Sequence, residues 1–397
     1  MRYITVSKRR IGIAGIILLM IAIGVWVVLP KHSSAPGSDA SGAGTKIPAP
    51  EAPIQPPGAP SRPVAAPDLW TRPSAEVASR NRRKSGFAWV LIPLGATEQQ
   101  LNRVVDGDLN GVVTELKQKA QAGDAASINI LGQLALLNCR LGHGSVTRFK
   151  TRQVTEAQAL PLADRDWFTA TVNDDVAFDK QIDAVCDQMD TKEILSRVTA
   201  WANQGDGASL WVLSEAGLPM KDLQERLRES SAAGFALAQS WLAQLIFSSD
   251  ESAESKGADQ PNPVELLNQA ASAMPSSKAD LANCEYFGEC EGIPVDIDAA
   301  IAHAREAAQD GYFSAILRIG PHLPAGQMDP DEVTAWGLID ASVEQQGCGG
   351  SIFLVRQMQN IMSTLNAPNI TSAARAQAEQ LWSAYGSQIK ANLGCAP

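Results

Sequence analysis

The chain has 397 residues, of which 45% are hydrophobic and 19% are charged, and its formal net charge is −10. This hydrophobic share allows a buried core, so the composition excludes a chain that is disordered throughout. Residues 1–38 carry basic residues and no acidic one, so the negative charge lies in the rest of the chain. Because binding to phosphate backbones needs clustered Lys and Arg, we expect no nucleic-acid partner.

The segment Ile11–Leu29 contains no charged residue and follows the basic residues Lys8–Arg10. As a helix it would span about 28 Å, close to the ~30 Å hydrocarbon thickness of a bilayer. A cleaved signal peptide, the alternative, has an apolar region of only ~7–15 residues, and either kind of segment would export the rest of the chain. The flanking positive charge favours a cytoplasmic N-terminus. The sequence therefore predicts a single-pass protein of the bacterial inner membrane, with residues 1–10 cytoplasmic, a transmembrane helix over 11–29 and a periplasmic C-terminal domain.

Residues 30–84 are rich in proline, alanine, glycine and serine. Eleven of the 23 prolines in the chain lie between Pro30 and Pro73. This composition leaves few apolar groups to bury, so we expect a disordered linker. It ends in a basic run from Arg80 to Lys84, for which a solvated boundary segment is the favoured interpretation, and contact with anionic lipid or another polyanion is the alternative.

The remaining residues, 85–397, exceed the usual size of one compact core, which favours several domains or an array of repeats. A helix-forming stretch, a turn with glycine and a second Ala/Leu-rich stretch recur, as in Leu116–Ala126 followed by Ile128–Ala135. The spacings of the turn glycines approximate one or two units of ~35–40 residues, the period of paired-helix solenoids. We therefore expect an all-α domain, an α/α solenoid of helix pairs, with an irregular helical bundle as the alternative. The turn glycines are Gly123, Gly205, Gly234, Gly311 and Gly347.

These residues resemble the Sel1-like repeat family, a relative of tetratricopeptide (TPR) repeats whose units read roughly A-A-x-x-G-x-x-x-A-x-x-x-L-G. The best match is Glu289–Ala315, which includes Gly292, Asp296 and the turn Ala307–Gly311. The unit around Gly123 keeps the terminal Leu-Gly pair, and two of the gaps between glycines are of double length, which indicates insertions or degraded units. The resemblance implies a non-enzymatic scaffold that binds partners on a concave face, and it carries no catalytic residue.

All the cysteines lie C-terminal to the apolar segment, and an even number of them in an exported domain favours disulfides over free thiols. We predict sequential pairing, because two pairs would each span 47 residues, about one neighbour in a solenoid, and the third spans six. A zinc site is the alternative, but no Cys-x-x-Cys pair or nearby histidine supports it, so we expect no metal. The predicted pairs are Cys139 with Cys186, Cys284 with Cys290, and Cys348 with Cys395.

Two groups of residues are candidates for a binding surface. Acidic residues recur at four-residue steps, which on a helix form a stripe of like charges that a cation or a basic partner would stabilise. A solvated helix face is the alternative for this stripe. Trp201 and Trp211 flank the Gly205 turn, where they either pack in the core or form a ligand platform. The stripe consists of Asp175, Asp179, Asp183 and Asp187.

No signature of a nucleophile elbow, zinc protease, Walker loop or dinucleotide site occurs in the sequence, and we expect no cofactor. The sequence therefore predicts a membrane-anchored periplasmic scaffold or adaptor, without enzymatic activity, for an exported or cell-envelope protein. Two alternatives stay open. One is an enzyme that acts on peptidoglycan through a single carboxylic acid on a helical scaffold. The other is an inhibitor or immunity-type binder of an exported enzyme.

Overall fold

The computed structural model describes residues 69–139, 143–215, 220–248, 261–349 and 355–395. In this part of the chain the regular structure is helical, apart from an isolated bridge between Ala325 and Met328. The predicted transmembrane helix over 11–29 lies outside the described residues, as do 1–10 and most of the predicted linker. Within the described ranges, no helix is long and apolar enough to cross a bilayer.

The helices are short, and the longest are α7 with 25 residues and α18 with 21. The first part of the chain contains α2 (Ala75–Leu91), α3 (Glu98–Val105), α4 (Leu109–Gln121), α5 (Ala125–Leu134), the π-helical turn η1 (Ala135–Cys139), α6 (His143–Glu156), the 3-10 turn η2 (Ala157–Ala159), α7 (Leu162–Cys186), α8 (Thr191–Ala202) and α9 (Gly207–Ser214). It continues with α10 (Met220–Ala232), α11 (Ala236–Ser248), α12 (Pro263–Ala273), α13 (Pro275–Phe287), α14 (Ile297–Gln309), α15 (Ser314–Ile319), the 3-10 turn η4 (Gly320–His322), α16 (Pro330–Gln345), α17 (Val355–Leu365) and α18 (Ser372–Asn392).

The predicted glycine turns join consecutive helices in pairs. Gly123, between α4 and α5, has a φ of 91°, and Gly205, between α8 and α9, has a φ of 86°. This left-handed conformation ends a helix at little cost only in glycine. The aspartate after each of them caps the next helix, since Asp124 accepts from the amide of Ser127 and Asp206 from that of Ser209. The paired-helix repeats predicted from the glycine spacing are thus confirmed.

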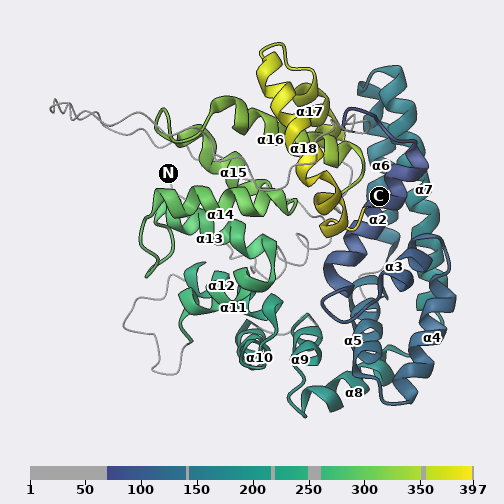
Figure 1. Cartoon of the computed structure of the whole chain (residues 1–397). Helices are drawn as coiled ribbons and strands as arrows, with labels where there is room; N and C mark the ends of the chain where they lie inside the picture. The colour runs from purple at the N-terminus through teal and green to yellow at the C-terminus, as the bar shows by residue number, and fades with distance from the viewer. Residues whose placement is uncertain (1–68, 140–142, 216–219, 249–260, 350–354, 396–397) are drawn as a thin grey trace, which may run out of the picture.

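The second helices of these pairs form an inner layer. Helices α5, α9 and α13 contain no exposed residue, and in α11 only the last, Ser248, is exposed. In Figure 1, α5 and α11 lie closer to the middle of the molecule than α4 and α10 do. Polar contacts join the neighbours in this layer, from Ser209 Oγ to Asn129 Oδ1 (2.6 Å) and from Ser277 Oγ to Ser240 Oγ (3.0 Å).

The helical pair α6 and α7 interrupts the repeats. Helix α5 packs directly on α8 and α9, so the pair is an insertion on the outside of the array. It accounts for the double gap between Gly123 and Gly205 in the sequence. Its second helix, α7, packs against α2, α4 and η1.

The array closes on itself, because the residues that precede α3 contact the C-terminal helices (Figure 1). Asn81 Nδ2 donates to the carbonyl of Gln346 (3.0 Å), and the amide of Gly349 donates to Ser85 Oγ (2.9 Å). Trp70 Nε1 donates to Glu379 at 3.0 Å. A small core that α17 shares with α6 and α7 also crosses this junction. The described helices therefore form a ring rather than an open solenoid.

The boundary of the predicted linker at residue 84 is wrong. Residues 69–84 belong to the folded domain, and Leu69, Arg82 and Lys84 are buried in it. The linker was predicted to reach residue 84 because most of the side chains that α2 buries are polar or charged, a composition that is typical of solvated segments. Their partners are supplied by α7, by Glu98 of α3 and by the turn after α16.

The three predicted disulfides are confirmed. The Cα atoms are 5.2 Å apart for Cys139–Cys186, 5.1 Å for Cys284–Cys290 and 5.7 Å for Cys348–Cys395. The first joins the end of α7 to η1, and the last joins the turn after α16 to the turn after α18. Three disulfides indicate a domain that resides in an oxidising, extracytoplasmic compartment.

Candidate functional site on the inner helices

The predicted acidic stripe is largely internal. Asp175 and Asp179 are buried on α7, whereas Asp183 is half-buried and Asp187 is exposed. Lys150 of α6 pairs with Asp179 at 2.7 Å, and Arg82 of α2 pairs with Asp175 at 2.5 Å. The compensating cations expected for this stripe therefore come from the same chain, and the four residues do not form a continuous exposed surface.

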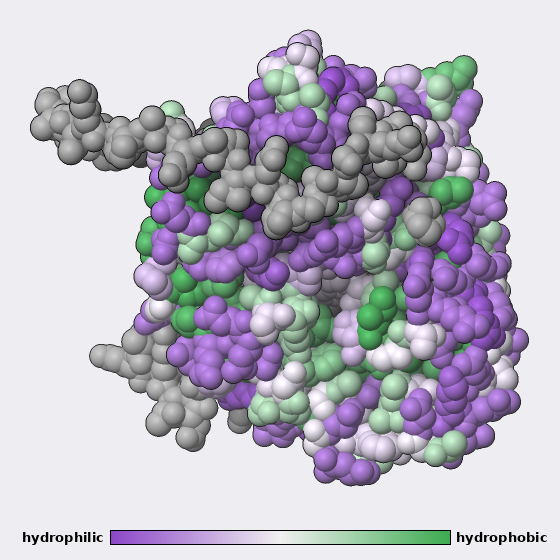
Figure 2. Space-filling view, viewed as in Figure 1, coloured by the Kyte–Doolittle hydropathy of each residue, from purple (hydrophilic) through white to green (hydrophobic). Residues whose placement is uncertain are grey.

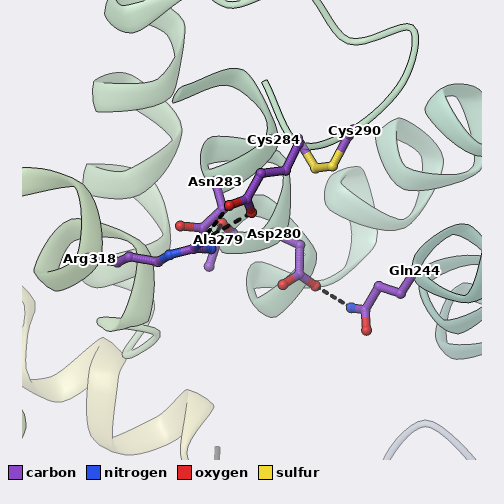
Figure 3. Close-up of a disulfide and its surroundings, with 8 residues drawn as sticks. Gln244, Ala279, Asp280, Asn283, Cys284, Cys290 and Arg318 are labelled. Atoms are coloured by element: carbon purple, nitrogen blue, oxygen red, sulfur yellow. Dashed lines mark hydrogen bonds and ion pairs between the residues drawn. A yellow bond between two sulfur atoms is a disulfide. The ribbon is translucent and has the colours of Figure 1, made fainter. Parts of the chain in front are cut away.

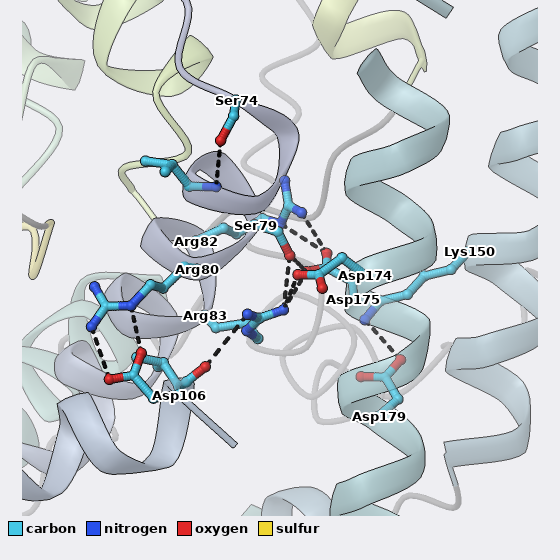
Figure 4. A network of polar contacts seen from close by, with 12 residues as sticks. Ser74, Ser79, Arg80, Arg82, Arg83, Asp106, Lys150, Asp174, Asp175 and Asp179 are labelled. Atoms are coloured by element: carbon cyan, nitrogen blue, oxygen red, sulfur yellow. Dashed lines mark hydrogen bonds and ion pairs between the residues drawn. The ribbon is translucent and has the colours of Figure 1, made fainter. Parts of the chain in front are cut away.

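A polar network joins α2 to α7 at this place (Figure 4). Arg83 Nη1 donates to Asp174 (2.6 Å) and to Ser79 Oγ (2.9 Å), and Ser79 Oγ donates to Asp175 at 2.5 Å. Burial raises the pKa of Asp174, but the nearby Ser79 hydroxyl and the guanidinium groups of Arg83 and Arg82 outweigh it, so this pKa lies below its ordinary value. The basic run that was interpreted as a solvated boundary thus holds α2 on α7.

The two tryptophans of the predicted platform pack with the core. Trp211 is 3% exposed and meets Trp241 edge-on, with ring centroids 5.6 Å apart, and Phe235 at 6.0 Å. Trp201 is half-buried against the same cluster. Because Trp211 contacts aromatic rings of α10–α11 and has almost no free surface, it joins neighbouring repeats and offers no ligand platform.

A different set of acids, here called the inner acids, lies partly buried on or next to three helices of the ring. Glu215 directly follows α9, Asp280 lies on α13, and Asp340 and Glu344 lie one turn apart on α16. Each side chain is only partly exposed. None of the four forms an ion pair with another described residue.

Burial raises the pKa of all four carboxyl groups. It raises the pKa of Glu215 to about 7 and, against a hydrogen bond from Gln244, that of Asp280 to about 6. The pKa values of Asp340 and Glu344 are raised by burial as well, and the charge of Glu344 adds to the effect on Asp340.

The surroundings of Asp280 show how these acids are held (Figure 3). Asp280 accepts a hydrogen bond from Gln244 of α11 at 2.6 Å. The nearby cation, Arg318, points elsewhere: it stacks on Phe287 at 4.2 Å and pairs with Glu289 at 3.0 Å. Cys284, one turn after Asp280, is bonded to Cys290, which fixes the end of α13. The carboxyl group of Asp280 is thus oriented by an amide and is not neutralised.

The internal cavities do not suit a small ligand. The two best-formed cavities of the described chain each have a volume of about 10 Å³, roughly that of one water, and apolar side chains line most of their walls. Within the same ranges, no cluster of His, Cys, Asp and Glu could hold a metal ion. On the face shown in Figure 2, apolar atoms gather near the middle and hydrophilic ones dominate the right-hand side, over α3, α4 and α7. This surface suits a macromolecular partner better than a small molecule.

No protein-family model matches this chain, and no curated protein matches it. A solved structure is similar to it over 78% of this chain and 71% of the other, with 18% sequence identity and a TM-score of 0.39. It is c5321, a protective antigen present in uropathogenic Escherichia coli strains that displays an SLR fold. SLR denotes the Sel1-like repeat, the family that the sequence resembles.

Sequence reasoning missed the inner acids. Each of the four lies in, or directly after, a helix whose other residues are mostly small or apolar. Glu215, for example, follows Leu210–Ser214. An acidic residue in such a helix indicates a possible binding site, because a helix that packs on both sides has no solvated face for a charge. This indication is weak without knowing which helices form the inner layer.

Proposed function

We propose that this protein is a membrane-anchored scaffold in the bacterial periplasm, and that it binds a basic segment of an exported or cell-envelope protein along its inner helices. The observation that carries the proposal is a set of partly desolvated acids, none of which forms an ion pair with another described residue: Glu215, Asp280, Asp340 and Glu344.

Charge explains why a basic partner fits. A Lys or Arg placed among these acids would gain a favourable interaction in a region of low effective dielectric constant, and it would lower their raised pKa values. The net charge of −10 attracts a basic partner over a longer range and repels an acidic one. Helical-repeat proteins commonly present such extended surfaces to other proteins.

The proposed location rests on two features. The three disulfides require an oxidising compartment. The apolar segment Ile11–Leu29 has the length of a membrane span, and the Pro-rich residues after it would hold the domain away from the bilayer.

Photocrosslinking in cells tests this function. A photoreactive residue at Gln244, beside Asp280, should give one discrete adduct with a protein of basic character. The same residue at Lys192, exposed on α8, is the control and should not give it. The paired substitution Glu215→Gln and Asp280→Asn should reduce the adduct several-fold. Equal adducts from both positions, or adducts with lipid or wall fragments alone, would contradict a scaffold of this kind. If the crosslinked protein is an exported enzyme, this protein is an immunity-type binder.

A second candidate function depends on Glu215. A general acid for glycoside cleavage must be protonated near neutral pH, and a pKa of about 7 meets that condition. The alternative is therefore a peptidoglycan-cleaving enzyme with Glu215 as its acid. Release of fragments from purified peptidoglycan, abolished by Glu215→Gln and retained by Asp280→Asn, would favour this enzyme over the scaffold.

A further inference from the structure

The segment 69–85 covers the junction of the ring with the buried apolar side chains of Leu69 and Ala78 and with a larger set of buried polar groups. Ser79, Asn81, Arg82, Lys84 and Ser85 are all buried, each less than 9% exposed. Their partners are charged groups of α7, Glu98 at the start of α3, and backbone groups near the C-terminus. When such a contact opens, water can take the place of the lost partner, which it cannot do for a buried apolar side chain.

The seat for this segment is formed by two glycine turns. A Cβ atom at Gly347 would overlap the carbonyl oxygen of Ala78, and one at Gly394 would lie 2.8 Å from Cβ of Ala88. The backbone of α2 therefore lies directly on both turns. Cys348 and Cys395, each adjacent to one of these glycines, are joined to each other. The disulfide thus holds together the two sides of the seat.

The character of α2 changes at Gly86. After it, Phe87, Ala88 and Leu91 pack in the large apolar core with α3 to α5. Gly86 itself is exposed, and a Cβ there would meet no atom within 4 Å. A serine–glycine step in the middle of a helix is a common site of bending. The polar first part of α2 can therefore move about Gly86 while the apolar second part stays in place.

We propose that residues 69–85 are a releasable strap that closes the ring, with Gly86 as its hinge and the disulfide-bonded turns at Cys348 and Cys395 as its seat. The chain before Leu69 leads directly into this strap, so a pull on the N-terminal segment acts on the strap before any other described element. Release leaves across the junction the contact of Gly394 with Ala88 and the small core of α6, α7 and α17.

Trypsin tests the strap in the full chain, because its preferred residues Arg82, Arg83 and Lys84 lie in the strap and their side chains are at most 13% exposed. Gly347→Ala should speed cleavage within 80–85 by about tenfold, since cleavage follows the population of the open form. Gly123→Ala is the matched control: its φ of 91° is as unfavourable for alanine as the 82° of Gly347, but its Cβ would meet open space. Equal cleavage in both variants, or simultaneous cleavage throughout the domain, would overturn the strap.

The disulfide gives a second comparison. Cys348→Ser with Cys395→Ser should speed strap cleavage, whereas Cys284→Ser with Cys290→Ser, far from α2, should not. A third measurement needs no variant: in the wild-type protein, amides of 79–85 should exchange with deuterium faster than those of 88–91. Uniform exchange along α2, or strap cleavage that responds equally to both cysteine pairs, would show that the segment is an integral part of the core.

Discussion

Arg82 of α2 and Asp175 of α7 form a buried ion pair, with 2.5 Å between Nη2 and Oδ2 and with side-chain exposures of 6% and 10%. Arg82 belongs to the basic run at the start of the folded region, and Asp175 belongs to the acidic stripe. Each feature, taken alone, suggests an external partner of opposite charge. In the structure they neutralise each other, so neither is free to recruit one.

Removal of Arg82 should be costly. Arg82→Ala leaves Asp175 buried with only Ser79 and the more distant Arg83 as partners, and we expect a loss of about 3–5 kcal/mol in the free energy of unfolding. Arg80→Ala is the control, because its ion pair with Asp106 is more exposed, at 29% and 51%, and should contribute about 1 kcal/mol or less. Urea unfolding measures both, and equal losses would contradict the buried pair as a stabilising contact.

The sequence predicted the features that depend on local chemistry. Gly123 and Gly205 predict their turns because only glycine takes that conformation at little cost, and an even number of cysteines in an exported domain predicts disulfides. Ring closure could not be predicted, because it depends on contacts such as Asn81 with Gln346, 265 residues apart. The local sequence of a polar helix does not indicate which distant part of the chain will supply hydrogen-bond partners for its side chains.

The inner acids make stability depend on pH. The folded protein keeps the proton of Glu215 up to a pKa of about 7, whereas the unfolded chain loses it near 4.5. Its contribution to stability is therefore complete below pH 4.5 and is lost as pH rises through 7. The contribution of Asp280 to stability is lost in the same way as the pH rises from 3.8 to about 6. We expect the free energy of unfolding to fall between about pH 4 and pH 7, by on the order of 1 kcal/mol for each acid after allowance for solvent screening.

Glu215→Gln should remove part of that fall, and Glu193→Gln, on the exposed face of α8, should not. At low pH the sign reverses: Asp106 and Asp174 have pKa values below 3.8, so the stability they provide is lost as pH falls below that value. Urea unfolding across this pH range would therefore show a maximum near pH 4. A Glu215→Gln variant that keeps the full fall from pH 4 to 7 would rule out Glu215 as its source.

The disulfides should differ in their contributions to stability. In the chain-entropy model, a link that spans 47 residues contributes about 4 kcal/mol and one that spans six contributes about 2 kcal/mol. Replacement of Cys139 and Cys186 by serine should therefore lower the unfolding free energy about twice as much as replacement of Cys284 and Cys290. The short link has another role, since it fixes the end of the helix that carries Asp280. Equal losses would show that local contacts, rather than loop closure, set the contribution of each bond.

Replacing a helical glycine by alanine can act on stability through packing or through the backbone, and two glycines of this protein separate these effects. A Cβ at Gly132 of α5 would lie 2.7 Å from Val198 and 3.0 Å from Val212, so Gly132→Ala should force α8 and α9 away and cost about 1–3 kcal/mol. Gly86→Ala meets open space in the middle of α2, and it should instead stabilise by about 0.5–1 kcal/mol, because alanine loses less backbone entropy in a helix. A stiffer hinge at Gly86 should also slow tryptic cleavage of the strap. If Gly86→Ala stabilises the protein but leaves that cleavage unchanged, the strap must bend elsewhere.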